Sequence, residues 1–433
     1  MQALPDRTPK RQKRVMRLNA SMGIIRTTGF TAALLAVTIV SAQASAVHEA
    51  SNEGVRGAAK PERIPVLQRI YGPENAKVRA AIHELETEST HYRRTGVRSD
   101  PTHEVDYHAM HPLKNNRRLE DLTTEEKISY FEPMRITFVT DALDEERTVS
   151  NAKQIDFVKE KVLDRMGAYW SEALNVVPVG SGDEIPLKIN AGELVSSMFC
   201  GHSEFTKVPS EHMTDGIADT DMILYVSASS STQFCGPSTL AVAVACNFDQ
   251  FDRPTAGAIN FCLEQIDLDS DGTTHESIEQ DNVDVAIHEA AHVFGMSSNS
   301  YKYYWDAEAD PPAVRTSRPF QSQTVTCVDE VQRTLSIPDT NTLQFLTAKN
   351  GQRYAAIVTP KVQTVVRNHF NCMDLEGGQL ENQPTGSNSC TGDHWDERLY
   401  YPESLSGVIS PTSVTLSPLS KFILYFEIRC TLF

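Results

Sequence analysis

The chain has 433 residues, of which 40% are hydrophobic and 22% are charged. This composition is typical of a globular protein and excludes a disordered or fibrous chain, and the length allows one large domain or two ordinary ones. The formal net charge of −17 argues against a nucleic-acid partner, because such a partner requires a basic face.

Residues 1–46 have the order of a secretory signal. A basic region is followed by an uncharged apolar run, residues 27–40, and then by small residues that fit a cleavage site. The apolar run is shorter than the ~20 residues that span a bilayer, so we expect secretion and no transmembrane span. The alternatives are a mitochondrial transit peptide, because the basic region is long and rich in Arg, and a start at Met22.

The pattern of a folded domain begins near residue 133. Residues 47–132 are polar and free of cysteine, which is typical of a propeptide or spacer. Beyond them, apolar residues that alternate or run together predict strands, and apolar residues three or four apart predict helices. The predicted strands are residues 135–140, 222–227, 240–246 and 256–262, and the predicted helices are residues 152–174 and 281–294, the second capped by Asp281. This mixture predicts an α+β fold.

The second predicted helix carries a His-Glu-Ala-Ala-His motif at residues 288–292. One helical turn places His288 and His292 on the same face, where both imidazoles can reach one zinc ion. Glu289 sits beside the first ligand, where it can hold a water molecule and take its proton. The alternative is an ordinary surface helix that happens to carry two histidines.

A catalytic zinc site needs a third protein ligand and an open fourth position. Gly295 allows the chain to turn sharply after the second histidine, before a later histidine completes the site. In the shortest form of such a motif, the third histidine stands three residues after the glycine. That position is 298, and it is occupied by Ser298. Downstream, His369 follows a Val-rich, strand-like run and reads as a packed or surface residue. His394 lies in a turn and is the better candidate ligand.

All eight cysteines lie at or after residue 200. An even number behind a signal segment indicates disulfides in an oxidising compartment. The sequence alone does not choose among the possible pairings of Cys200, Cys235, Cys246, Cys262, Cys327, Cys372, Cys390 and Cys430.

Together these residues resemble the leishmanolysin family, which includes the invadolysin-like peptidases. That family keeps the H-E-x-x-H-x-x-G motif and delays its third histidine by a long insertion. The similar segments are residues 199–209, 219–226, 256–260, 371–381 and 394–398, within a resemblance that extends over roughly residues 133–411. The resemblance implies a metzincin-like zincin, with a mixed twisted sheet, a backing helix and an active-site helix.

The resemblance also implies the organisation of the chain and its site. Residues 133–295 would form the N-terminal zincin subdomain, and residues 296–410 an inserted subdomain that carries the third histidine. It further implies one catalytic Zn²⁺, a Cys200–Cys246 disulfide and synthesis as a secreted or surface-tethered proenzyme. The expected ligands are His288, His292 and His394, with Glu289 as the catalytic base.

Two features near the expected site depart from the family. The Met-turn that members place beneath the metal has Leu405 at the methionine position, and Leu keeps nearly the same volume. No cysteine precedes Cys200, so latency would need another group, such as Asp106 or a neighbouring histidine.

The end of the chain also departs from the family, whose members continue into a helix and a cysteine-rich domain. Here Pro411 and Pro418 interrupt any helical periodicity. We therefore expect residues 411–433 to be an atypical or truncated tail, in which residues 417–433 do not reproduce the family's packing.

The sequence thus predicts a secreted zinc-dependent endopeptidase that acts on protein or peptide substrates. A substrate would lie as an extended strand against a sheet edge, with residues 240–246 as the candidate edge. The alternative is an inactive secreted binding or adhesion protein built on a metallopeptidase scaffold.

Overall fold

The computed structural model describes residues 131–179, 186–237, 239–249, 251–306, 309, 313–382, 389–407 and 416–424. All of them belong to one compact unit, residues 62–433. The expected signal segment, all but the last two residues of the expected spacer, and Cys430 lie outside the described residues.

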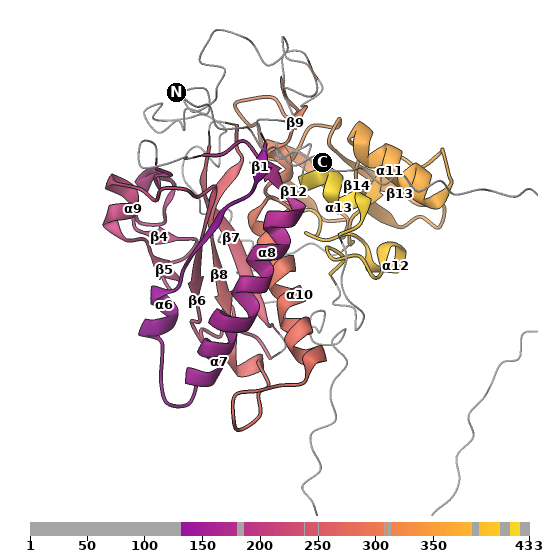
Figure 1. Ribbon diagram of the computed structural model, residues 1–433. Coiled ribbons are helices and arrows are strands. Elements are labelled where there is room, and N and C mark those ends of the chain that lie inside the picture. Colours follow the sequence, from indigo (N-terminus) through magenta and orange to yellow (C-terminus); the bar gives the residue numbers. More distant parts are fainter. Residues whose placement is uncertain are drawn as a thin grey trace, which may run out of the picture. The chain divides into compact units, whose positions relative to one another are not determined.

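A four-stranded mixed sheet lies at the centre of this unit (Figure 1). Its strands, in sheet order, are β2 (Ile136–Val139), β6 (Met222–Ser227), β8 (Pro254–Phe261) and β7 (Ala241–Phe248). The first three are parallel, and β7 is an antiparallel edge strand. The four strands predicted from the sequence are therefore confirmed, and so is the mixture of strands and helices.

Strand β6 shows how the sheet is buried on both faces. Its residues Met222 and Leu224 belong to one apolar core, whereas Ile223 and Tyr225 belong to the other. Because successive side chains of a strand point to opposite faces, an unbroken apolar run fits a strand that is covered on both sides.

Two helical segments cover one face of this sheet. The first runs continuously through α7 (Ala152–Phe157), a π-helical segment η5 (Val158–Leu163) and α8 (Asp164–Ala173). The second is α10 (Glu276–Val293), which Figure 1 shows beside α8. Near the end of α10, the rings of Trp170 and Phe294 meet edge to face with their centroids 4.8 Å apart. The predicted helix at residues 152–174 is thus confirmed.

Helix α10 begins five residues earlier than the sequence analysis predicted. Its N-cap is His275, whose side chain accepts a hydrogen bond from the backbone N–H of Ser277, and Asp281 lies inside the helix. The prediction was wrong because the first turn is polar and faces solvent, so it lacks the apolar pattern by which a helix start is recognised. The predicted end is confirmed, since Gly295 follows the helix with a φ of +114°.

Gly257 lets α10 approach the sheet closely at the end of the helix that carries the histidines. A Cβ atom on Gly257 would overlap a methyl group of Val293 and lie 2.8 Å from the carbonyl oxygen of Val244. We expect Gly257→Ala to lower the free energy of unfolding by about 1–3 kcal/mol, because the packed neighbours must shift. Urea denaturation measures this change, and an unchanged midpoint would contradict such tight packing.

The opposite face of the sheet is covered by shorter elements. These are β4 (Phe199–Cys200), β5 (Thr206–Lys207), α9 (Ser210–Thr214) and the 3-10 turn η6 (Ala191–Glu193). The remaining short elements of this half are β1 (Glu132–Pro133), α6 (Asp141–Glu145), β3 (Asn175–Val176) and η7 (Leu263–Gln265).

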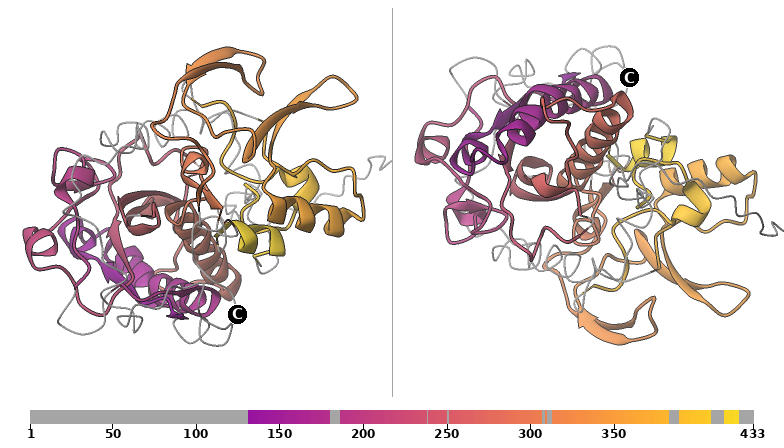
Figure 2. Two further views of the ribbon diagram at one scale, coloured as in Figure 1. Left: turned by 90° about the horizontal axis from the view of Figure 1, so that it is seen from above. Right: turned by 90° about the horizontal axis from the view of Figure 1, so that it is seen from below.

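A second group of elements follows α10 and lies to one side of it in both views of Figure 2. It contains a three-stranded antiparallel sheet of β13 (Leu343–Thr347), β14 (Arg353–Ile357) and β15 (Gly378–Gln379), with α11 (Pro360–Phe370) and α12 (Glu397–Tyr400). Shorter pieces are η8 (Tyr301–Tyr303), β9 (Trp305–Asp306), β10 (Ala313–Val314), β11 (Gln323–Thr326) and β12 (Gln332–Leu335).

The Val-rich run before His369 is helical, not strand-like. Pro360 occupies the first turn of α11, and Val362 and Val366 are buried one helical turn apart. The strand-like interpretation was wrong because it weighed the β-branched residues and not their spacing of four.

The described part of the tail forms a packed element, α13 (Pro418–Phe422). Pro418 stands in its first turn, where the missing N–H costs nothing, so this proline begins a helix and does not interrupt one. The hydroxyl of Ser417 caps the helix by accepting from the backbone N–H of Leu419. Leu419 and Ile423 are 3% and 0% exposed and belong to the main core.

We expect Ile423→Ala to lower the free energy of unfolding by about 2–5 kcal/mol, because it leaves a cavity in the core. Lys421→Ala, also within this segment but with a partly exposed side chain, is the matched control and should change stability by no more than about 0.5 kcal/mol. Urea denaturation of both variants is the measurement. Equal midpoints would mean that the tail contributes nothing to the core.

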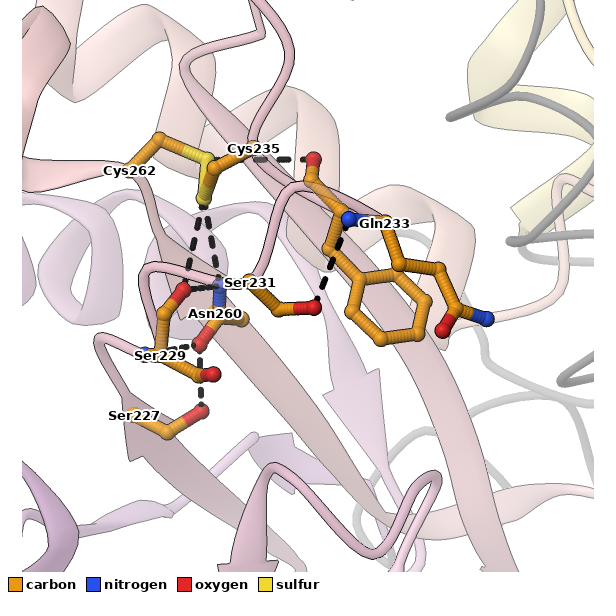
Figure 3. The surroundings of a disulfide bond; sticks show 8 residues. Ser227, Ser229, Ser231, Gln233, Cys235, Asn260 and Cys262 are labelled. Atoms are coloured by element: carbon orange, nitrogen blue, oxygen red, sulfur yellow. Dashed lines mark hydrogen bonds between the residues drawn. A yellow bond between two sulfur atoms is a disulfide. The ribbon is translucent and has the colours of Figure 1, made fainter.

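Three disulfides join cysteines of the described residues: Cys200–Cys246, Cys235–Cys262 and Cys327–Cys390. The first is the pair that the resemblance implies. Figure 3 shows the second beside Asn260, whose side-chain oxygen accepts from the hydroxyl of Ser227 and the backbone N–H of Ser229. Disulfides of this number fit an extracellular protein. Across the described ranges no helix is both long and apolar enough to cross a membrane.

Candidate metal centre

The two motif histidines lie one turn apart on α10, as their spacing predicts. Their Nε2 atoms are 3.0 Å apart, and both side chains are half-buried. The helix is held by its apolar residues against the sheet, so the imidazoles project from a fixed support.

His394 completes a triangle with them. Its Nε2 atom lies 3.1 Å from that of His288 and 3.2 Å from that of His292. Among the described residues, this is the one group of three His, Cys, Asp or Glu side chains whose ligand atoms gather closely enough to hold a metal ion. His369 lies elsewhere, exposed on α11 with its ring against Phe370.

Each imidazole is oriented through its other nitrogen. The Nδ1 atom of His288 lies 2.7 Å from the carbonyl oxygen of Ser404, and that of His292 lies 2.5 Å from the carbonyl oxygen of Met296. A carbonyl oxygen only accepts hydrogen bonds, so each Nδ1 must carry the proton. The third Nδ1, on His394, lies 2.9 Å from a carboxylate oxygen of Glu381.

With each Nδ1 in a hydrogen bond, the Nε2 atoms are the candidate ligand atoms, and all three lie close enough together to share one tetrahedral metal ion. Zn–N bonds of ~2.1 Å at tetrahedral angles separate the nitrogens by about 3.4 Å, close to the spacing found here. Burial lowers the pKa of both His288 and His292, and this favours the neutral imidazole that a metal requires. For His394, burial is the largest single effect and lowers the pKa, but the charge and hydrogen bond of Glu381 together with the charges of Asp393 and Glu289 raise it, and the net shift is upward. The donor set therefore fits zinc.

Glu289 follows His288 on α10 and lies close enough to the triangle for its carboxyl group to interact with the charge of His394. Burial raises the pKa of its carboxyl group to about 8, opposed in part by the charge of His394. A cation held by the imidazoles would favour the carboxylate form and lower this pKa.

The turn at residues 403–406 forms the support for His288. Leu405 is fully buried, and its carbonyl oxygen accepts from the backbone N–H of Trp395. The carboxylate of Glu403 accepts from the backbone N–H groups of Leu405 (2.6 Å) and Ser417 (3.0 Å), and from the hydroxyl of Ser420 (2.6 Å). Helix α13 is therefore bonded to the turn that orients the first histidine.

Ser298 occupies the position where the short spacing would place a third ligand. Its backbone N–H instead donates to the carboxylate of Asp393, at 2.6 Å. Because Asp393 precedes His394, this bond ties the loop after α10 to the turn of the third histidine.

Sequence reasoning missed Glu381 and Glu403, which contact the histidines or their supports. Both are carboxylates that are at most 5% exposed. One signal was present for the first of them, because Glu381 ends the family-like run at residues 371–381 and stands ahead of His394.

Comparison with known proteins gives the same family as the motifs. The chain is 28% identical to a leishmanolysin-like peptidase of Caenorhabditis elegans over 354 residues, covering 70% of this chain and 50% of that protein. It is 24% identical to the leishmanolysin-like peptidase of Drosophila melanogaster over 361 residues, covering 74% and 49%. A ciliated left-right organizer metallopeptidase of Xenopus laevis is 30% identical over 224 residues, covering 50% and 26%.

The chain spans about half the length, or less, of these curated relatives. The leishmanolysin family of peptidases, M8, matches residues 171–425, which is more than half of the chain and includes α10 and all three histidines. The chain therefore belongs to the leishmanolysin family of metallopeptidases.

Proposed function

We propose that this protein is a secreted zinc-dependent endopeptidase, with one Zn²⁺ held by His288, His292 and His394. The observation that carries the proposal is the convergence of three Nε2 atoms within 3.0–3.2 Å of one another, two of them from an H-E-x-x-H helix. Membership of a metallopeptidase family also supports the proposed function.

The work of hydrolysis would be divided between the ion and Glu289. A Zn²⁺ ion bound by these imidazoles acts as a Lewis acid, which polarises a carbonyl group and makes water more acidic. The carboxylate of Glu289 accepts a proton from the attacking water and delivers it to the departing amine. The three Nδ1 hydrogen bonds hold the imidazoles in place, so the ligands need not reorganise during the reaction.

The substrate would bind as an extended strand along β7. This strand ends the order of the central sheet, and it packs against α10, the helix that carries the motif. An extended peptide can pair with such an edge through main-chain hydrogen bonds, and pairing of this kind would accept polypeptides of varied sequence.

The wider architecture is included in the proposal. The mixed sheet, the backing helices and α10 would form the first subdomain of a metzincin-like fold, and residues 296–410 an inserted subdomain that carries the third histidine. Removal of residues 1–46 on secretion agrees with the three disulfides among the described cysteines.

Metal dependence of casein cleavage tests the proposal. We expect the purified protein to cleave casein, a chelator to abolish cleavage, and added zinc to restore it. A chelator already saturated with zinc is the control and should leave cleavage unchanged. Zinc binding without any turnover would instead favour the alternative, an inactive binding or adhesion protein on the same scaffold.

A further inference from the structure

The three histidines are not oriented in the same way. Two of them donate to backbone carbonyl oxygens, whose positions are set by the backbone, whereas His394 donates to the side chain of Glu381. We propose that Glu381 is a positioning residue that fixes the ring of His394 toward the metal. This inference rests on the proposed zinc site and concerns how its third ligand is set.

The position of Glu381 is defined by its own contacts. Its side chain is nearly inaccessible to solvent, 3% exposed as a residue, and Oε1 accepts from Nδ1 of His394 (2.9 Å) and the backbone N–H of Asp393 (3.1 Å). The backbone N–H of Glu381 also donates to the carbonyl oxygen of His394, at 2.9 Å. Glu381 is thus bound to the turn of His394 through both its side chain and its backbone.

Gly392 gives independent support. A Cβ atom at this position would overlap the side chain of Glu381, so only glycine allows the carboxylate to lie where it does. The backbone of Gly392 does not have a positive φ that would itself favour glycine. The absence of a side chain is therefore explained by the close approach of Glu381.

The physical need for such a residue follows from the separation of the ligands. His288 and His292 are aligned by one helix, whereas His394 lies 102 residues beyond His292, in a turn. An imidazole with no partner on Nδ1 can rotate or shift the proton to Nε2, and either change removes the lone pair from the metal. A carboxylate acceptor prevents both and makes the imidazole a stronger donor to the metal.

Zinc affinity of purified variants, measured by competition with a chromophoric chelator, tests the inference. We expect Glu381→Ala to weaken zinc binding about 10–100-fold. We expect a similar loss from Gly392→Ala, which keeps the carboxylate but displaces it. Glu381→Gln should lose less than Glu381→Ala, because the N–H of Asp393 holds an amide oxygen at the Oε1 position.

Asp396→Ala is the matched control. Asp396 is also buried and lies in the same region, but its carboxylate contacts Arg398 and Gln379 and no imidazole. It should lower thermal stability and leave zinc affinity within about twofold of the original protein. Should Glu381→Ala fail to fold, Glu381→Asp serves instead, because it withdraws the carboxylate by one methylene.

The outcomes separate this inference from the proposed function. Zinc binding by the original protein, with unchanged affinity in Glu381→Ala or in Gly392→Ala, would overturn the role of Glu381 alone. An equal loss of affinity in Asp396→Ala would overturn it too, because the effect would then be general destabilisation. Absence of zinc binding in the original protein would overturn the proposed function and this inference together.

Discussion

Glu289→Gln is expected to retain zinc and to lose about 10²–10⁴ in turnover. The amide has nearly the same shape as the carboxylate but cannot accept the proton of the attacking water. The three histidines keep their Nδ1 partners, so the metal site itself is unchanged. Metal content and casein cleavage, measured on the same preparation, give the two halves of the expected result.

Glu276→Gln is the control for this substitution. Glu276 is exposed in the first turn of the same helix, 12 residues before His288. Both zinc content and turnover should therefore be unaffected. Normal turnover of Glu289→Gln with a full complement of zinc would refute the assignment of Glu289 as the base. Loss of zinc from that variant would show that the carboxylate supports the metal site.

The central sheet was predictable because its strands are apolar runs or, at residues 135–140, an alternation of apolar and polar residues. Residues 222–226 form an unbroken apolar run of strand length, which predicts a strand buried on both faces. The structure buries all six residues of β6. The start of α10 was not predictable in this way, because its first turn is polar and its cap is a histidine. Local sequence identifies what is buried more readily than where a solvated helix begins.

Tertiary contacts also reversed two local interpretations. The β-branched residues of α11 suggested a strand, yet two of them, Val362 and Val366, meet the core one helical turn apart. Pro418 suggested an interruption, yet it starts a helix whose apolar residues enter the same core. In α11 the spacing of buried residues outweighed the β propensity of their residue types. In α13 the position of the proline decided the outcome, because a first-turn proline is compatible with a helix.

The candidate site was predictable as far as its motif extended. The spacing of His288 and His292 depends only on helical geometry, and His394 came from a turn and a family resemblance. The roles of the supporting carboxylates were not predictable, even though Glu381 ends a family-like run, because Glu381 and Glu403 act through contacts between separate segments of the chain. No periodic pattern in the local sequence identifies such residues. Only the folded arrangement shows that a buried carboxylate faces a ligand.

His394→Ala is expected to remove most of the affinity for zinc, whereas His369→Ala should leave it unchanged. Loss of a ligand removes a metal bond outright, so its effect should exceed the ~10–100-fold that loss of an outer partner costs. His369 is exposed on α11, and no hydrogen bond or ring contact described for it reaches the other histidines. The two variants together therefore distinguish the downstream histidines.

Chelator competition on both variants provides the measurement, with thermal unfolding as the check that each is folded. Activity is a second readout, and it should fall with zinc occupancy in His394→Ala alone. If instead His369→Ala loses zinc and His394→Ala keeps it, the third ligand has been misassigned. In that event the three Nε2 atoms would not form the metal site, because removing one of three shared ligands must weaken binding of the ion.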